Sequence, residues 1–239
     1  MTKKPALLLL PNLLGEQPHH EPYLPASVDK AVESLDGLIA ESESGGRRYL
    51  KRFKTAKPAV EIPIALLHKK SSQEDYDFLL EPIAAGERWG LVSDAGLPCL
   101  ADPGALLVRR ARQKGIAVQA FVGPSSITLA LMLSGLPSQQ FTFHGYFPKE
   151  QGERSRLIAR LEKQSQSEGL THLFIEAPHK NKHSLETLLT TLSDTSYLCV
   201  AWDLTLPTQG LVSAPVAQWK KSPLPNIEKK PAIFLFNAA

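Results

Sequence analysis

The chain has 239 residues, of which 43% are hydrophobic, and a formal net charge of +3. This length suits one large domain or two small ones, and the apolar fraction excludes a disordered chain. No stretch approaches the ~20 apolar residues of a membrane span, and the apolar run at residues 6–10 is shorter than the roughly 7–15 residues of a signal-peptide core. Cys99 and Cys199 are the only cysteines, so we expect no disulfide framework and no metal site in a cytoplasmic protein.

The first half of the chain alternates short apolar runs with amphipathic segments, a pattern typical of α/β proteins. The apolar runs that predict strands lie at residues 6–10, 38–40, 62–67, 89–93 and 116–122. The amphipathic segments predict helices at residues 27–35, 47–53, 74–85 and 103–114. In the last of these helices, Asp102 is the expected N-cap, Pro103 the first helical residue and Gly115 the stop.

A further helix is expected to open at residues 123–126 and to run to Gly135, after which the pattern restarts. Strands are predicted at residues 141–146, 173–176, 197–204 and 232–236, and helices at residues 153–166 and 182–192. The sequence therefore predicts an α/β fold with two domains, residues 1–123 and residues 124–239.

Residues 91–104 read Leu-Val-Ser-Asp-Ala-Gly-Leu-Pro-Cys-Leu-Ala-Asp-Pro-Gly and follow a predicted strand. In open α/β sheets, ligands bind outside the carboxyl ends of the strands. Gly96 lets a backbone approach a ligand closely, and Pro98 stiffens the loop. We therefore predict a ligand site in this loop, although Asp102 by itself is better explained as a helix cap.

The segment Gly123-Pro124-Ser125-Ser126 is a glycine turn at the start of a predicted helix. Free N–H groups at such a position suit a carboxylate or a phosphate. Taken alone, this segment is better explained as an ordinary capping turn.

Taken together, the segments 92–104, 123–126, 134–137 and 143–149 resemble the tetrapyrrole (corrin/porphyrin) methylase superfamily. Within it they are most similar to the branch of the small-subunit ribosomal RNA ribose methyltransferase I. The resemblance is dense over residues 89–149 and weaker at residues 174–180, at residues 203–205 and in the final strand.

The resemblance implies a class III methyltransferase fold, with two αβα domains and S-adenosyl-L-methionine in the cleft between them. It also implies a homodimer. By motif position, the residues implied to lie along the methyl donor are Pro11, Asp94, Ala95, Gly96, Leu100, Ser125, Ser126, Ala177, Pro178 and Thr205.

The chain departs from the ribosomal branch on the side that takes the methyl acceptor. Residues 10–15 read Leu-Pro-Asn-Leu-Leu-Gly where that branch has Thr-Pro-Ile-Gly-Asn-Leu. Its acidic and histidine-rich segments match here only at Glu41 and His68. A ribose hydroxyl is a poor nucleophile that a general base would help. The candidates for this base are Glu41, His68, Asp94 and Glu176, each of which can instead be a cap or a surface hydrogen-bond partner.

A basic cluster follows the second predicted strand and consists of Arg47, Arg48, Lys51, Arg52, Lys54 and Lys57. Two interpretations stay open for it: contact with RNA phosphates, or a solvated helix face. The same two interpretations apply to a second patch at residues 179–183.

Three functions are compatible with these observations. The first is an S-adenosyl-L-methionine-dependent methyltransferase that acts on a ribose 2′-hydroxyl of ribosomal RNA. The second is a methyltransferase for a tetrapyrrole or another small molecule, and the third is a non-catalytic RNA-binding relative. The basic clusters and the Ser-Asp-Ala-Gly form of the loop favour the first.

Overall fold

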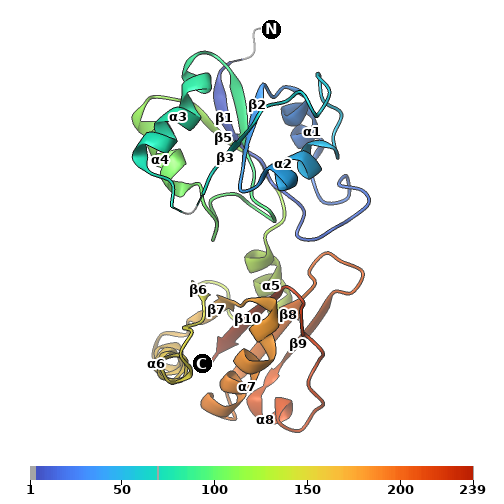
Figure 1. Ribbon diagram of the computed structural model, residues 1–239. Helices are drawn as coiled ribbons and strands as arrows, with labels where there is room; N and C mark the ends of the chain where they lie inside the picture. Colours follow the sequence, from blue (N-terminus) through green and yellow to red (C-terminus); the bar gives the residue numbers. More distant parts are fainter. Residues whose placement is uncertain (1–3, 69, 239) are drawn as a thin grey trace. The chain divides into compact units, whose positions relative to one another are not determined.

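The structure is a computed structural model that describes residues 4–68 and 70–238 (Figure 1). The chain divides into two compact units, the first ending at Ser125 and the second beginning at Ser126. Each unit contains a five-stranded sheet of its own. Within the described ranges, no helix has both the length and the apolar character needed to cross a membrane.

The sheet of the first unit is parallel throughout, with the strand order β3-β2-β4-β1-β5. Figure 1 shows helices on both sides of it, α1 and α2 on one side and α3 and α4 on the other. The strands are β1 (Ala6–Leu9), β2 (Gly37–Ala40), β3 (Ile64–Leu66), β4 (Arg88–Leu91) and β5 (Val118–Ala120). The helices are α1 (Ala26–Glu33), α2 (Glu43–Leu50), α3 (Gln73–Ala84) and α4 (Ala105–Gln113).

Two layers of apolar side chains hold this sheet between its helices. Leu8 and Leu38 belong to the core that also contains the buried residues of α1 and α2. Leu7 and Ile39 belong to the core on the side of α3 and α4. Successive side chains of a strand point to opposite faces, so a strand that is buried on both faces is a continuous apolar run. The apolar runs at residues 6–10, 38–40 and 89–93 therefore correspond to the inner strands of an αβα layer structure, and those at residues 62–67 and 116–122 correspond to its edge strands.

The second unit has a mixed sheet with the strand order β6-β7-β10-β8-β9. Only β6 and β7 are parallel, and the other neighbours are antiparallel. The strands are β6 (Phe141–Tyr146), β7 (Thr171–Ile175), β8 (Tyr197–Trp202), β9 (Gly210–Pro215) and β10 (Ala232–Asn237). The helices are α5 (Ser126–Ser134), α6 (Gln151–Glu168), the 3₁₀ helix η1 (Pro178–Lys180), α7 (Asn181–Thr191) and α8 (Val216–Trp219).

Helices cover both faces of this second sheet as well. Buried side chains of α6, α7 and α8 share one core with Val212 and Ala214 of β9. Between these two residues, Ser213 points to the other face, where its hydroxyl donates a 2.6 Å hydrogen bond to the carbonyl of Ser134 at the end of α5. The α/β prediction with two αβα layer structures is therefore confirmed.

The predicted start of α4 is wrong. The helix begins at Ala105, and its N-cap is Gly104, whose φ is +129°. A Cβ on Gly104 would lie 2.7 Å from the sulfur of Cys99, so only glycine fits this close approach to the preceding loop. Asp102 and Pro103 consequently belong to the loop and not to the helix. The predicted stop is confirmed, because Gly115 follows the helix with a φ of +71°.

Other elements also differ from the prediction. α2 runs over Glu43–Leu50 and not over residues 47–53, because Ser42 caps it by accepting a hydrogen bond from the N–H of Gly45. β9 and α8 were not predicted. Most residues of β9 (Gly210–Pro215) are partly buried. Its sequence therefore lacks the alternation of apolar and polar residues that predicts a strand.

Candidate functional site

The site residues expected in the first unit gather where β1, β4 and β5 end. These strands are parallel, so their carboxyl ends meet at one edge of the sheet. Pro11 and Asn12 follow β1, residues 92–96 follow β4, and residues 121–125 follow β5. We refer to this part of the first unit as the carboxyl edge.

The side chain of Asn12 joins two of these segments. Its Nδ2 donates hydrogen bonds to the carbonyl oxygens of Ser93 and Asp94, at 2.9 Å and 3.0 Å. Its backbone N–H donates to the carbonyl of Gly96 at 2.8 Å. Its Oδ1 accepts a hydrogen bond of 2.8 Å from Nη1 of Arg52. The buried amide thus fixes the loop after β4 through its donor end and holds Arg52 through its acceptor end.

Sequence reasoning did not single out Asn12 as a site residue. The available signal was a polar residue within the apolar run Leu10-Pro11-Asn12-Leu13-Leu14, directly after a strand. Such a residue needs hydrogen-bond partners if it is buried, and Asn12 is only 6% exposed.

Close backbone packing brings the third segment to the same place. A Cβ on Gly123 would lie 2.1 Å from the Cβ of Pro11. A Cβ on Gly96 would lie 3.5 Å from the carbonyl oxygen of Pro124, and the φ of Gly96 is +70°. The segments after β1, β4 and β5 therefore pack against each other through main chain and small residues.

The loop between β4 and α4 has a strained backbone. Cys99 and Ala101 have φ values of +69° and +67°, which are uncommon for residues other than glycine. Leu100 lies between them and is 43% exposed. Strain of this kind persists only where the surroundings impose it, and it clusters at functional sites. Burial, followed by the charge of Asp102, raises the pKa of the Cys99 thiol to about 11, which keeps it protonated at neutral pH.

Two of the four candidate bases lie together at the carboxyl edge. Oε1 of Glu41 accepts a hydrogen bond of 3.2 Å from the backbone N–H of Asp94. The exposed carboxylate of Asp94 lies beside the start of α2, where a Cβ on Gly45 would be 2.8 Å from its Oδ1. Glu41 therefore positions the backbone that carries the Asp94 carboxylate.

A cavity of about 230 Å³ adjoins this carboxylate. Its walls come from the segment after β1, from α2 and from the loop after β4. Its lining includes Asn12, Glu16, Gly45, Arg48, Arg52 and Asp94.

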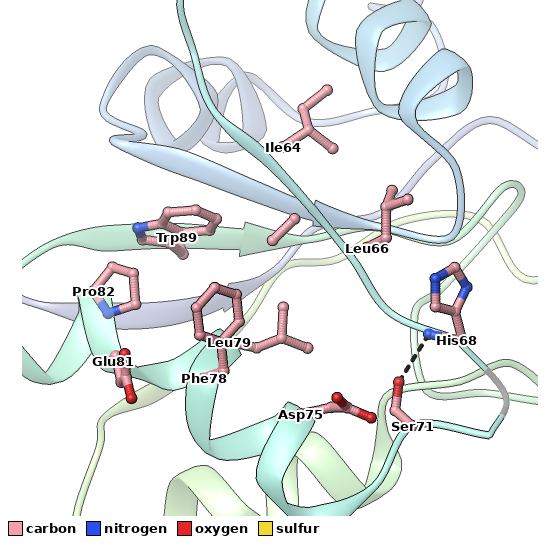
Figure 2. Close-up of a pocket in the computed structure, with 11 residues that line it drawn as sticks. Ile64, Leu66, His68, Ser71, Asp75, Phe78, Leu79, Glu81, Pro82 and Trp89 are labelled. Carbon is pink, nitrogen blue, oxygen red and sulfur yellow. Dashed lines mark hydrogen bonds between the residues drawn. The ribbon is translucent and has the colours of Figure 1, made fainter.

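The structure places His68 in other cavities. One has about 510 Å³ and lies between β3 and α3, where Phe78 and Trp89 contribute to a largely apolar wall (Figure 2). The backbone N–H of His68 donates to the hydroxyl of Ser71 at 3.1 Å. The second has about 320 Å³ and lies beside the loop that contains Asp102. Neither cavity is lined by Asp94 or Glu41.

The arginines of the basic cluster are not simply solvated. Arg47 donates through Nη1 to the carbonyl oxygens of Ala59 and Ile62, at 2.8 Å and 2.6 Å, so it holds the loop before β3. Arg48 forms an ion pair of 2.7 Å with Glu16. The exposed cations of the cluster that line no described cavity are Lys51, Lys54 and Lys57.

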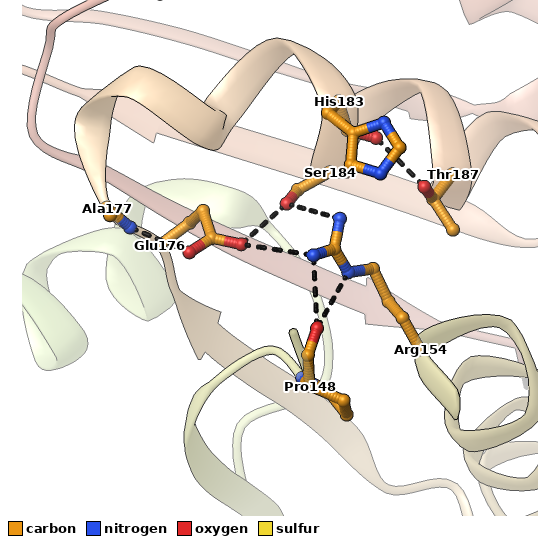
Figure 3. A network of polar contacts seen from close by, with 7 residues as sticks. All are labelled: Pro148, Arg154, Glu176, Ala177, His183, Ser184 and Thr187. Carbon is orange, nitrogen blue, oxygen red and sulfur yellow. Dashed lines mark hydrogen bonds and ion pairs between the residues drawn. The ribbon is translucent and has the colours of Figure 1, made fainter. Parts of the chain in front are cut away.

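In the second unit, Glu176 is buried in a network of polar contacts (Figure 3). Its Oε2 accepts a hydrogen bond of 2.7 Å from the hydroxyl of Ser184 and lies 3.9 Å from Nη2 of Arg154. Its Oε1 accepts a hydrogen bond of 2.8 Å from the backbone N–H of Ala177. Arg154, only 1% exposed, also donates to the carbonyl of Pro148. The geometry gives Glu176 a positioning role toward Ala177.

The other expected residues of the second unit lie at the ends of β7 and β8. Pro178 begins η1, and its carbonyl accepts a hydrogen bond from the N–H of Lys229. After β8, Asp203 donates its N–H to the carbonyl of Pro231, and Thr205 has a φ of +73°. The segment before β10 therefore joins the two strand ends, and it brings Pro178 and Thr205 to the same edge of the second sheet.

Two expected residues flank the division between the units. Ser125 is buried and is the last residue of the first unit, and Ser126 is the first residue of α5. In the described part of the chain, no three His, Cys, Asp or Glu side chains gather into a metal-binding group.

Comparison with solved structures gives the fold. The methyltransferase CobJ matches with a TM-score of 0.65 and 15% identity, over 98% of this chain and 95% of that one. A uroporphyrin-III-C-methyltransferase from Thermus thermophilus matches with a TM-score of 0.55 and 14% identity, over 98% and 95%.

Comparison of sequences gives closer relatives. The ribosomal RNA small subunit methyltransferase I of Escherichia coli O157:H7 is 32% identical over 79% of this chain and 63% of its own length. The protein of the same name from Thermotoga maritima is 29% identical over 83% and 86%. The chain thus spans less than two thirds of the first relative's length. The model of the tetrapyrrole (corrin/porphyrin) methylases matches residues 23–219. The chain therefore belongs to the tetrapyrrole (corrin/porphyrin) methylase family.

Proposed function

We propose that this chain is an S-adenosyl-L-methionine-dependent methyltransferase that acts on a ribose 2′-hydroxyl of small-subunit ribosomal RNA. The family and the names of its relatives support the reaction class and the kind of acceptor. The observation that carries the proposal is the carboxyl edge of the first unit, where one buried side chain, Asn12, ties a strained loop to the end of β1.

The methyl donor is proposed to lie along this edge, against Pro11, Leu100, Ser125 and residues 94–96. The residues fit such a nucleoside in two respects. A side chain on Gly96 or Gly123 would meet atoms of the neighbouring segment. Both positions therefore favour glycine, and their main-chain groups are available to line a ligand. The exposed Leu100 offers an apolar contact. The positions in the second unit, Ser126, Ala177, Pro178 and Thr205, remain predictions from the resemblance.

When bound, the donor supplies a methyl group on a sulfonium whose leaving group is neutral. The protein then has to align the reacting groups and exclude water. In general, such effects lower the activation barrier by at most roughly 7–11 kcal/mol. The loop after β4 serves alignment, because Asn12 and Glu41 hold its main chain from two sides. A loop fixed before binding loses little entropy when the ligand arrives.

Asp94 is the carboxylate that we propose to accept the proton of the ribose hydroxyl. It is exposed at the carboxyl edge, and it borders a cavity large enough for part of a nucleotide. Glu41 is proposed to act through Asp94, because its carboxylate accepts a hydrogen bond from the backbone N–H of that residue.

We also propose that the protein is a homodimer and acts in the cytoplasm, where ribosomal subunits are assembled. Multi-angle light scattering of the purified chain measures the first, and a mass equal to one chain would contradict it.

The function is tested by transfer of a tritiated methyl group to small ribosomal subunits from a strain that lacks this protein. A corrinoid and a uroporphyrinogen serve as parallel acceptors. We expect label in the ribosomal RNA, within a dinucleotide that resists alkali because its 2′-oxygen is methylated. Label in a small molecule alone would favour the second function. Absence of label together with absence of donor binding in calorimetry would identify a non-catalytic relative.

A further inference from the structure

The cavity beside Asp94 is lined by two arginine side chains, neither of which is among the residues proposed to hold the methyl donor. Arg48 and Arg52 line it from positions four residues apart, one on α2 and the other two residues after it, so that their side chains lie on the same face. The cavity is also lined by Asp94 and by the segment after β1, whose Glu16 and Asn12 contact Arg48 and Arg52. Its volume of about 230 Å³ suits a phosphate group with part of a sugar.

Burial distinguishes the two guanidinium groups. Arg52 is partly buried, and burial is the largest cause that lowers its pKa; the charge of Glu16 opposes this shift, and the charge of Arg48 adds to it. Arg48 is 58% exposed and pairs with Glu16, whose side chain is 78% exposed. An exposed ion pair of this kind contributes little and is easily exchanged. The side chain of Glu16 therefore occupies a position that a stronger anion can take.

We propose that this cavity is a subsite for the phosphate next to the methylated ribose, with Arg48 and Arg52 as its ligands. The inference rests on the proposed function and deepens it by naming how the RNA is held. In RNA, a ribose 2′-hydroxyl and the 3′-phosphate of the same nucleotide are neighbours. A cavity with two guanidinium groups on one wall and a carboxylate at its border matches that pair, since guanidinium groups bind phosphate oxygens through paired N–H donors.

The subsite is physically connected to the loop that is proposed to hold the donor. Arg52 donates to Oδ1 of Asn12, and Nδ2 of the same Asn12 donates to the carbonyls of Ser93 and Asp94. A phosphate bound by Arg52 would thus be connected to the backbone of the loop after β4 through the side chain of Asn12 alone. Occupation of the subsite and order in this loop are expected to favour each other.

The test uses the full chain and a short fluorescein-labelled single-stranded RNA, with affinity measured by anisotropy over a series of salt concentrations. Arg48→Gln removes the more exposed ligand, and we expect the dissociation constant to rise about tenfold and the salt slope of log K to fall by about 1. Arg48→Lys keeps the charge and is expected to retain most of the slope. Arg112→Gln removes an exposed arginine of α4 that lines no described cavity, and it serves as the matched control.

Glu16→Gln gives a result that loss of folding cannot imitate. This variant removes the carboxylate that pairs with Arg48, so we expect it to bind the RNA more tightly than the unaltered chain. Weaker binding by Glu16→Gln, or equal effects of Arg48→Gln and Arg112→Gln, would overturn the subsite. Calorimetry with S-adenosyl-L-methionine separates the two proposals. If the unaltered chain binds the donor but no RNA, the proposed acceptor fails together with the subsite. If it binds both and Arg48→Gln changes nothing, only the subsite fails.

Discussion

The side chain of Asn12 donates a hydrogen bond of 2.9 Å to the carbonyl of Ser93, across 81 positions of the chain. It links the end of β1 to the end of β4, which lie side by side in the sheet. The loop that begins at Asp94 is therefore held from the neighbouring strand as well as from its own.

Replacing Asn12 by alanine is expected to weaken donor binding. The change leaves the carbonyls of Ser93 and Asp94 without their buried donor, at a cost of about 1–3 kcal/mol. Because 1.4 kcal/mol corresponds to a factor of ten, we expect the dissociation constant for S-adenosyl-L-methionine to rise about tenfold in calorimetry. Asn12→Asp keeps the acceptor for Arg52 but not the donor, so it should behave like alanine. Wild-type affinity in both variants would contradict the role of the amide.

Gly123→Ala is expected to separate the ends of β5 and β1. The new methyl group would lie 2.1 Å from the Cβ of Pro11, and overpacking of this kind typically costs about 1–3 kcal/mol. Urea unfolding measures this loss, and donor affinity should fall with it. Gly152→Ala is the control: its Cβ would meet its nearest atom, Nη1 of Arg156, at 3.5 Å, so stability should stay equal or rise by up to about 1 kcal/mol. Equal stability of both variants would disprove the close approach.

Asp94→Asn separates proton transfer from donor binding. If the carboxylate accepts the hydroxyl proton, kcat should fall by about 10²–10⁴ while the affinity for the donor stays near that of the unaltered chain. Glu41→Gln retains an oxygen that can accept from the backbone of Asp94, so its kcat should fall far less. Single-turnover methyl transfer measures both variants. A kcat for Asp94→Asn within a few-fold of the unaltered enzyme would exclude Asp94 as the base.

Stability should fall in mild acid because of a histidine pair in the second unit. Nε2 of His144 lies 3.0 Å from Nδ1 of His172. Burial, followed by the charges of His172 and Arg160, lowers the pKa of His144 from 6.5 to about 4. A folded-state pKa below the unfolded one means that protonation favours unfolding, so the stability is complete above pH 6.5 and is lost as the pH falls from 6.5 toward 4.

His144 is only half-buried, so solvent screening limits the expected loss to about 1–2 kcal/mol. Urea unfolding at a series of pH values measures it. His144→Gln should flatten this pH dependence, whereas His19→Gln, which alters an exposed histidine, should leave it unchanged. The same slope in all three proteins would refute the assignment.

Much of the fold could be predicted from local patterns. The inner strands β1 and β2 of the first sheet are continuous apolar runs because both of their faces are buried, and this is visible in the sequence without any partner. The stop at Gly115 was equally predictable, since a left-handed residue after a helix strongly favours glycine. The segment after β4 and the turn at residues 123–126 could be singled out for the same reason, because glycine and proline mark backbone geometry directly.

What the sequence determined by itself was therefore the α/β class, the central strands and the loops that form the carboxyl edge, because periodicity and turn residues act over a few positions. Only the tertiary structure determined which groups each polar side chain contacts. It gave Asn12 its carbonyls on β4, bonded Arg47 to the loop before β3, brought Glu41 to Asp94 and left His68 elsewhere. These contacts join residues far apart along the chain, and a side chain's partner depends on which strands the sheet makes neighbours.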